Sequence, residues 1–332
     1  MAVCGTIDNV AVCGMACAIP QRRVDNAGFS STFGDEQMSK FEKMVGVVER
    51  RVSGETESTA DLAFSAAKKL QDNGIWKPDD VDAVLFVTQT PDHVLPATAC
   101  DLQHRFGIKH SAIAFDINLG CSGFVYGVFT ASSLLQMEGI DKVLLLGGDT
   151  ITKLTSPTDA GSAPLFGDAG FATVLAKSGN ASPIHYSFMT DGSGAKAIEA
   201  QPGGRLFMDG MDVFNFTINE VPQLIKEQMS RLGLSQEQVD YLVLHQANKF
   251  VLKQVAMATG FSMKKVPVSI DRYGNTSSAS IPVTLCDMKE RDASLAVKKV
   301  VMSGFGVGLS WGVLVMDFDF NSCFGIVCGG DL

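Results

Sequence analysis

The sequence predicts an α/β fold built from two similar halves. Apolar segments typical of buried strands alternate with helix-like segments along most of the 332 residues, a pattern of sheets whose mostly parallel strands are covered by helices. Three strand segments of the first half also recur in the same order in the second half, displaced by roughly 150 to 160 residues. We expect the halves to span residues 1–178 and 179–332 and to meet near Lys177–Ala181.

The first half should contain strands at its apolar segments and helices between them. A strand is predicted over Ile7–Ala18, and a polar segment without clear periodicity then runs to Lys43. A helix should begin near Ser58, because an acidic, Ser/Thr-rich start precedes small and apolar residues at helical spacing. The other expected elements are strands over Asp82–Val87, Ala112–Ile117 and Lys142–Gly148, a helix over Ala97–Phe106, and a helix that follows Cys121 and runs to about Glu138.

The second half repeats this order. Its predicted strands are Asp240–His245, Lys265–Ile270 and Lys299–Gly304, and its clearest helix is Lys249–Ala258. Active sites of open α/β sheets form beyond the carboxyl ends of strands, so the loops after the repeated strands should converge. Those loops carry Cys121, His245 and Asn275.

Composition excludes several classes of function. With 46% hydrophobic and 19% charged residues the chain can bury a large core, and its net charge of -9 disfavours binding to nucleic acid. The eight cysteines form neither a CxxC pair nor a Cys/His cluster at zinc spacing, which indicates a reduced, cytoplasmic protein without a metal site. The apolar run Val10–Pro20 is too short to span a membrane and has no basic residue before it.

Cys121 is the candidate nucleophile. It stands between a predicted strand and a predicted helix, where the helix dipole and unpaired N–H groups favour a thiolate that can attack a thioester. Gly120 and Gly123 leave the approach open. A buried structural cysteine is the alternative, and this segment alone does not decide between the two.

His245 and Asn275 are the candidate hydrogen-bond donors. An isolated histidine is more often a core residue, and Asn275 within Tyr273–Ser277 also fits an ordinary turn. Their positions at strand ends equivalent to that of Cys121 favour one site, in which the cysteine accepts an acyl group and the other two stabilise an oxyanion. The glycine-rich segment Ser303–Gly312 offers backbone N–H groups to this site or is a packing turn.

At these residues the sequence resembles the thiolase superfamily, and within it the β-ketoacyl-[acyl-carrier-protein] synthase III family. The resemblance extends from about Asp8 to Phe318. Its motifs are Asp116–Gly123 (DINLGCSG), Phe166–Gly170 (FGDAG), His245–Asn248 (HQAN), Tyr273–Ser277 (YGNTS) and Gly304–Gly308 with Trp311-Gly312.

The resemblance implies a five-layered αβαβα fold, a homodimer and a ping-pong decarboxylative condensation. By the same resemblance, Cys121 accepts the acyl primer, and His245 and Asn275 bind the malonyl thioester and stabilise its enolate. The backbone N–H groups of Cys121 and Val307 would form the oxyanion hole for acyl transfer. The substrates would be acyl-CoA or acyl-carrier-protein thioesters, with no further cofactor.

Three departures from the family bear on the substrate. Lys40 and Ala160 stand where better-known members have a tryptophan and an arginine that sandwich the adenine of CoA, which weakens the inference of an acetyl-CoA primer. Leu95 stands where a phenylalanine often shortens the acyl pocket, so a longer or branched primer is expected. The chain also continues beyond Phe318 to Leu332, and the family pattern gives this tail no role.

Lys249 and Lys253 are the candidate carrier-protein contacts. They lie four residues apart and therefore on one face of the predicted helix, with Lys264 and Lys265 soon after. Carrier proteins of this kind are acidic, so docking on an acidic chain needs a local basic surface. An ordinary solvated helix face is the alternative.

Two other functions remain open from the sequence. The chain could transfer the acyl group from Cys121 to an oxygen or nitrogen nucleophile, or act as a non-catalytic subunit that shapes a partner's acyl tunnel. The presence of both His245 and Asn275 favours decarboxylation, and an intact Cys121 argues against the non-catalytic role.

Overall fold

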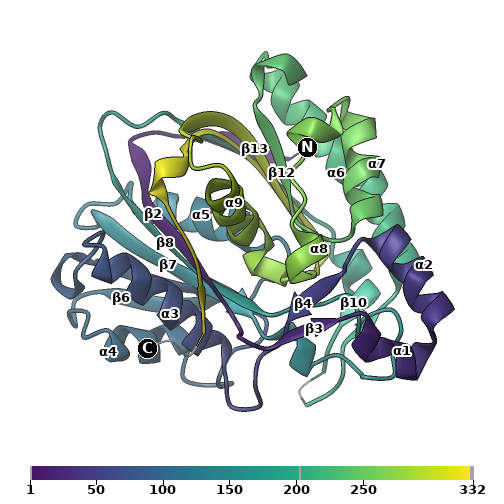
Figure 1. Cartoon of the computed structure of the whole chain (residues 1–332). Coiled ribbons are helices and arrows are strands. Elements are labelled where there is room, and N and C mark those ends of the chain that lie inside the picture. The colour runs from purple at the N-terminus through teal and green to yellow at the C-terminus, as the bar shows by residue number, and fades with distance from the viewer. Residues whose placement is uncertain (1, 202, 330–332) are drawn as a thin grey trace.

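Two β-sheets stacked with helices form the body of the protein (Figure 1). The computed structural model describes residues 2–201 and 203–329. Within these residues, a six-stranded sheet has the order β15-β2-β8-β7-β5-β6, and a five-stranded sheet has the order β1-β9-β14-β13-β12. Two further pairs, β3 with β4 and β10 with β11, lie outside these sheets.

The strands of the described chain are β1 (Val3–Ile7), β2 (Val10–Ile19), β3 (Arg23–Asp25), β4 (Glu49–Arg51), β5 (Ala83–Val87), β6 (Ile113–Ile117), β7 (Lys142–Asp149), β8 (Ala169–Lys177), β9 (Ile184–Thr190), β10 (Ile198–Glu199), β11 (Phe207–Met208), β12 (Tyr241–Leu244), β13 (Val297–Gly306), β14 (Ser310–Asp319) and β15 (Cys323–Cys328). Its α-helices are α1 (Ala27–Phe33), α2 (Asp35–Val45), α3 (Thr59–Asp72), α4 (Thr98–Arg105), α5 (Gly123–Leu134), α6 (Gly210–Arg231), α7 (Lys249–Thr259), α8 (Ile270–Tyr273) and α9 (Ser280–Arg291).

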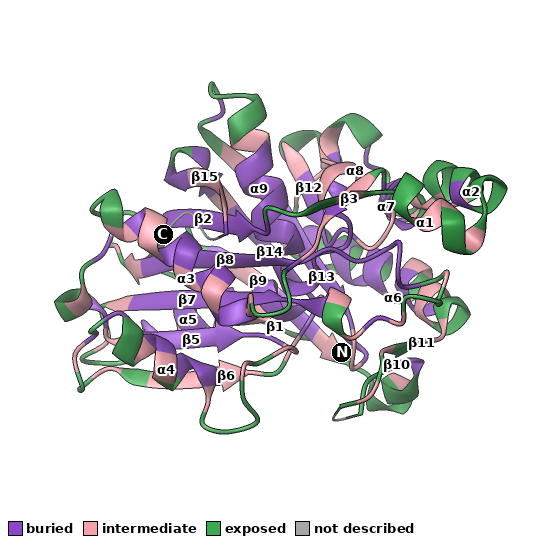
Figure 2. Cartoon of the chain, turned by 60° about the horizontal axis from the view of Figure 1, so that its bottom comes forward, coloured by how far each residue is buried: buried purple, intermediate pink, exposed green. Residues whose placement is uncertain are grey.

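The helices complete a five-layered arrangement. Helices α5 and α9 lie between the two sheets, and residues such as Phe124 and Leu285 join the hydrophobic core there. Helices α3 and α4 cover the outer face of the six-stranded sheet, whereas α6 and α7 cover the outer face of the five-stranded sheet. Figure 2 shows the central strands as mostly buried and the exposed residues as concentrated on outer helices and loops. The αβαβα fold expected from the resemblance is therefore confirmed.

The sheets are mixed, so the expectation of mostly parallel strands is wrong. Strand β5 runs parallel to β6 and β7, and β12 runs parallel to β13. In contrast, β8 runs antiparallel to both β2 and β7, and β14 runs antiparallel to both β9 and β13. Strands β13 and β14 form a hairpin joined by a short turn, which requires antiparallel pairing.

Most elements expected from the apolar pattern are present. Helix α3 begins after Ser58, whose side chain and that of Asp61 form a reciprocal capping box, as the Ser/Thr-rich start predicted. The opening strand predicted over Ile7–Ala18 is divided into β1 and β2, because Asn9 turns the backbone with a φ of 62°.

The strand predicted over Lys265–Ile270 is wrong. This segment runs from the end of a short 3-10 turn (Met263–Lys265) to the start of α8, and Pro267 can donate no backbone hydrogen bond within it. The side-chain amide of Gln246 instead accepts the backbone N–H groups of Ser269 and Ile270, at 3.0 and 3.3 Å. A side chain therefore satisfies the backbone groups that a neighbouring strand would have paired.

The two ends of the chain extend opposite sheets. Strand β1 pairs with β9 in the five-stranded sheet, whereas β15 pairs in parallel with β2 in the six-stranded sheet. The tail beyond Phe318, which the sequence left without a role, thus supplies an edge strand. The division into halves at residues 178 and 179 stays a prediction.

None of the helices in residues 2–201 and 203–329 is both long and apolar enough to cross a lipid bilayer. All eight cysteines lie in this part of the chain and are free thiols.

Candidate active site

A pocket with about 810 Å³ of unfilled space reaches Cys121. Its wall contains His245, Asn275 and Val307 as well as Cys121, so the structure brings together four residues singled out from the sequence. Most of the remaining wall is apolar and comes from helices α6 and α7, β11 and the loop before β8. The wall residues include no aspartate, glutamate, lysine or arginine within the described chain.

Cys121 lies in the turn between β6 and α5, where the backbone of β13 approaches closely. A side-chain carbon at Gly306 would lie 2.6 Å from Cβ of Cys121, and the φ of Gly306 is 157°. Glycine is therefore required at this position. The backbone N–H groups of Cys121 and Val307 both hydrogen bond to the sulfur. Two donors from different segments thus surround Sγ.

The expected thiolate is not favoured in this chain. Burial raises the pKa of Cys121 to about 12, and the negative charge of Asp149 acts in the same direction. Hydrogen bonds from Ser277 and from the two backbone N–H groups oppose this rise but are weaker than the desolvation. The helix start therefore does not decide the protonation state, although part of the Cys121 surface remains accessible from the pocket.

Asn275 is positioned by a backbone pairing with the loop before β8. Its backbone N–H donates to the carbonyl of Leu165 at 2.9 Å, and its carbonyl accepts the N–H of Gly167 at 3.1 Å. Its side-chain Oδ1 accepts the backbone N–H of Ser277 at 2.9 Å. Because Oδ1 is used in this way, the NH₂ group of the amide remains as the donor of a nearly buried side chain.

His245 follows β12 and is almost fully buried. Its Nδ1 lies 2.7 Å from the hydroxyl oxygen of Ser280, and the edge of its ring meets Phe305. Burial lowers the pKa of His245 to about 3, and a hydrogen bond that the imidazole donates to the backbone of Ser277 opposes this shift. The imidazole is therefore neutral, and when the Ser280 hydroxyl donates to Nδ1 the proton resides on Nε2.

Asp149 is a buried residue of the site that sequence reasoning missed. It ends β7, and its carboxylate accepts hydrogen bonds from the backbone of Gln89 at 2.8 Å and from the hydroxyl and backbone of Ser278 at 2.7 and 3.2 Å. It also accepts a hydrogen bond from the side chain of Ser277, whose hydroxyl lies 4.0 Å from Sγ of Cys121. Asp149 thus ties the loops after β5 and β7 to the loop that carries Asn275.

The strand-end rule used for Cys121 was sufficient to identify Asp149, since it closes the third repeated strand of the first half. Gln89 was also missed. It follows β5, at the equivalent position on the neighbouring strand, and lies on the pocket wall.

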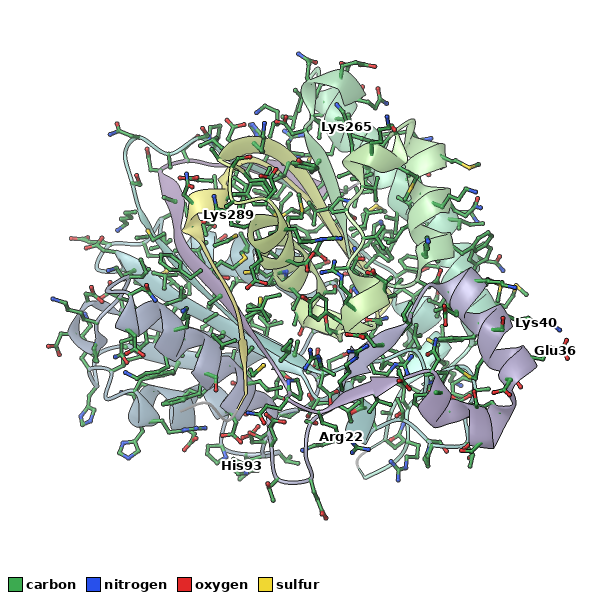
Figure 3. The ribbon with its side chains drawn as sticks, in the orientation of Figure 1. Arg22, Glu36, Lys40, His93, Lys265 and Lys289 are labelled. Atoms are coloured by element: carbon green, nitrogen blue, oxygen red, sulfur yellow. The ribbon has the colours of Figure 1, made fainter. Side chains whose placement is uncertain are left out.

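Leu95 does not line this pocket in the single chain, contrary to expectation. It lies in the loop between β5 and α4 with 80% of its surface exposed, next to Val94 with 95% exposed. The neighbouring His93 lies at the outer margin of the molecule in Figure 3. Leu95 is therefore not part of the pocket wall of the single chain.

The two positions that depart from the adenine-binding pattern lie outside the pocket wall. Lys40 is on α2, points away from the molecule beside Glu36 in Figure 3, and forms an ion pair with it at 2.7 Å. Ala160 lies in the loop before β8 and is partly exposed. Neither position offers a flat side chain that could stack on a base.

Lys249 and Lys253 are exposed on α7. This helix begins at the pocket, because Asn248 and Val251 both lie on the pocket wall and Asn248 caps the helix through the N–H of Val251 at 2.7 Å. Apolar Phe250 is also partly exposed on α7. Within the described residues, no group of three or more potential ligands is arranged to hold a metal ion.

Comparison with known proteins agrees with this geometry. Residues 115–200 match the model of 3-oxoacyl-[acyl-carrier-protein] synthase III, and residues 229–318 match the model of the C-terminal part of that family. The chain is 34% identical over 313 residues to a β-ketoacyl-[acyl-carrier-protein] synthase III of Staphylococcus haemolyticus, covering 93% of this chain and 98% of that protein.

Solved structures give the same result. A 3-oxoacyl-(acyl-carrier-protein) synthase from Burkholderia xenovorans is 35% identical with a TM-score of 0.95, covering 98% of this chain and 99% of the other. A synthase III from Pseudomonas aeruginosa is 29% identical with a TM-score of 0.85, covering 94% and 98%. With its cysteine, histidine and asparagine gathered in one pocket, this chain belongs to the 3-oxoacyl-[acyl-carrier-protein] synthase III family of condensing enzymes.

Proposed function

We propose that the protein catalyses the decarboxylative Claisen condensation of an acyl primer with a malonyl thioester, giving a 3-oxoacyl thioester for fatty-acid or related acyl-chain biosynthesis. In the first step the sulfur of Cys121 attacks the carbonyl carbon of the donor thioester, and the donor thiol leaves with the proton. In the second step the malonyl group loses CO₂, and the resulting enolate carbon attacks the acyl group on Cys121. The Cys121 sulfur is released as the leaving group.

The first step is supported by the backbone donors beside the sulfur. The N–H groups of Cys121 and Val307 lie beside the sulfur, where the carbonyl oxygen of a bound thioester would gain negative charge during attack. Because these donors are backbone groups, they are present whatever side chain residue 307 carries. The valine at this position is therefore compatible with an oxyanion hole.

The second step is supported by two neutral side-chain donors. The NH₂ group of Asn275 and the neutral imidazole of His245 line the same pocket, and both side chains are held by hydrogen bonds. Donors fixed in advance stabilise an enolate oxygen without reorganisation. No metal or organic cofactor is needed in this scheme, because decarboxylation itself supplies the electron pair.

The observation that carries the proposal is that Cys121, Asn275 and a neutral His245 line one pocket. A histidine whose pKa is lowered to about 3 donates a hydrogen bond well, but it is a poor general base for an alcohol or amine. Acyl transfer from Cys121 to an oxygen or nitrogen nucleophile would need such a base. Condensation needs only donors, so the geometry favours it over simple acyl transfer.

The test is to incubate the protein with a panel of acyl-CoA and acyl-carrier thioesters and to measure its intact mass before and after adding malonyl-carrier protein. We expect one acyl group on Cys121, followed by its loss as a 3-oxoacyl product with release of CO₂. Acylation without CO₂ release, combined with transfer to an added alcohol or amine, would favour the acyltransferase. A protein that never becomes acylated would fit the non-catalytic subunit.

We further propose that an acyl carrier protein docks over α7. Lys249 and Lys253 are exposed there, close to the pocket-lining start of the helix, and offer positive charge on a chain whose net charge is -9. Changing both lysines to glutamate should raise the KM for malonyl-carrier protein and weaken its salt dependence. Turnover of a small malonyl thioester should change little; equal losses with both substrates would indicate a role in the fold or the site instead.

We also propose a homodimer that pairs through β6. This strand is at the edge of the six-stranded sheet, and its Ile113 is 43% exposed. Its Asp116 accepts the N–H groups of Thr98 and Ala99 at 2.7 and 2.8 Å, which fixes the start of α4 just after the exposed Leu95. A second copy would cover this apolar surface. Light scattering should give a dimer mass for the native chain and a monomer mass for Ile113→Asp.

The cytoplasm is the proposed location. Eight free thiols, three of them exposed, are compatible with a reducing compartment and unlike a disulfide-stabilised secreted protein. Labelling of intact cells with a membrane-impermeant thiol reagent should leave the protein unmodified.

A further inference from the structure

The side chain of Gln89 lies beside the nucleophile. Its backbone N–H is fixed by the carboxylate of Asp149 at 2.8 Å. Its side-chain Oε1 packs against Gly120, the residue before Cys121. A Cβ atom added to Gly120 would collide with this oxygen and would lie 3.1 Å from the hydroxyl oxygen of Ser277. Since this hydroxyl is 4.0 Å from Sγ of Cys121, the amide of Gln89 belongs to the innermost part of the pocket.

The amide of Gln89 has no hydrogen-bond partner among the residues that the structure describes. The neighbouring hydroxyl groups are already engaged, because those of Ser277 and Ser278 both donate to Asp149. Much of the rest of the wall is apolar, with Ile151 and Phe305 among its members. An amide in such a wall loses hydrogen bonds to water when an apolar chain fills the pocket, which disfavours that chain.

The chemistry of the missing partner follows from the surroundings. A glutamine amide can both donate and accept, so it suits a hydroxyl or an oxo group. The wall carries no lysine or arginine that would pair with an anionic acyl group. The wall also lacks an aspartate or glutamate that would pair with a cationic group. The complementary substituent is therefore polar and uncharged.

We propose that Gln89 is a specificity-determining residue that hydrogen bonds an uncharged oxygen substituent close to the thioester end of the acyl group on Cys121. The preferred primers would then be hydroxyacyl or oxoacyl thioesters rather than plain alkanoyl thioesters. This inference rests on the proposed function, because it concerns the acyl group that Cys121 accepts. In the loading step the new thioester bond to Sγ replaces the bond to the donor sulfur, and Gln89 takes no part in the proton transfer.

The experiment compares 3-hydroxybutanoyl and butanoyl thioesters of N-acetylcysteamine, which have the same chain length and a small common carrier. The rate of Cys121 acylation is followed by intact mass, and the site is verified by peptide mapping. We expect the hydroxyacyl donor to load up to about tenfold faster, since one hydrogen bond to a pocket amide gives discrimination of that order. In Gln89→Met, which keeps the length of the side chain but removes the amide, the ratio should fall to about one.

A matched control is available on the same wall. The Thr217 hydroxyl already donates to the carbonyl of Val213 at 2.7 Å, so Thr217→Val should keep the wild-type ratio of the two donors. Equal loading of both donors by the native protein, or an unchanged ratio in Gln89→Met, would overturn the inference while leaving the condensing function intact. If neither donor nor any other thioester acylates Cys121, the proposed function fails and the inference fails with it.

Discussion

The two sets of donors in the pocket differ in origin and in charge behaviour. The set around Cys121 consists of backbone N–H groups in the turns before α5 and after β13. The other set consists of the side chains of His245 and Asn275, each oriented by a further hydrogen bond. The same desolvation raises the pKa of Cys121 to about 12 and lowers that of His245 to about 3. The pocket thus keeps both groups neutral at rest and leaves charge to develop only during reaction.

The largest effect is expected when the nucleophile among the backbone donors is removed. Cys121→Ser should abolish acyl loading, because a hydroxyl in this desolvated position is far harder to ionise than a thiol. Intact-mass analysis with acyl thioesters measures this directly. Full acylation at another residue of this variant would show that the donors around Cys121 serve some other purpose.

The second-largest effect is expected when one of the two side-chain donors is removed. His245→Ala or Asn275→Ala should slow malonyl decarboxylation by ~10²–10³, the typical cost of losing one preorganised donor, while acylation changes much less. Single-turnover acylation and CO₂ release measure the two steps separately. Equal losses in both steps would contradict the division of labour.

The third effect is a difference in pH dependence. Because the pKa of Cys121 is raised to about 12, the thiolate fraction should grow roughly tenfold per pH unit, and alkylation by iodoacetamide should rise without a plateau up to about pH 9. Because the pKa of His245 is lowered to about 3, its neutral form persists above about pH 5, and decarboxylation by Cys121→Ala should stay nearly constant there. A plateau of alkylation near neutral pH would mean that the N–H groups outweigh desolvation after all.

The smallest expected effect concerns the charge behind Cys121. Asp149→Asn removes a carboxylate that raises the pKa of Cys121, so alkylation at a fixed pH should become several-fold faster. Thermal unfolding should also begin at a lower temperature, since the loss of acceptors leaves buried donors poorly paired at a cost of about 1–3 kcal/mol.

Asp168 supplies the matched control for this variant. It is equally buried and accepts hydrogen bonds from Ser53 and Thr152, but it does not contribute to the pKa of Cys121. Asp168→Asn should therefore lower thermal stability without accelerating alkylation. Faster alkylation in both variants would indicate general loosening of the fold rather than loss of one charge.

The sequence identified functional residues where they follow an apolar segment that predicts a strand. Cys121, His245 and Asn275 were found because each follows a predicted strand or stands near one, and the family motifs gave their roles. Neither the raised pKa of Cys121 nor the exposure of Leu95 was predictable, because both depend on how loops distant in sequence pack. The false strand at Lys265–Ile270 had the right apolar pattern, but Gln246 satisfies its backbone instead of a neighbouring strand.

The pairing of β15 with β2 has a consequence for the order in which the protein can fold. Cys323 lies opposite Met15, so one edge of β2 is paired by a strand that follows it by about 300 residues in the chain. Until β15 has been synthesised, β2 has an unpaired edge, and the closure of so long a loop is slow. A nascent chain stalled before residue 320 should therefore hold an incomplete six-stranded sheet, and its β2 edge is the place where contact with other chains or with chaperones is expected.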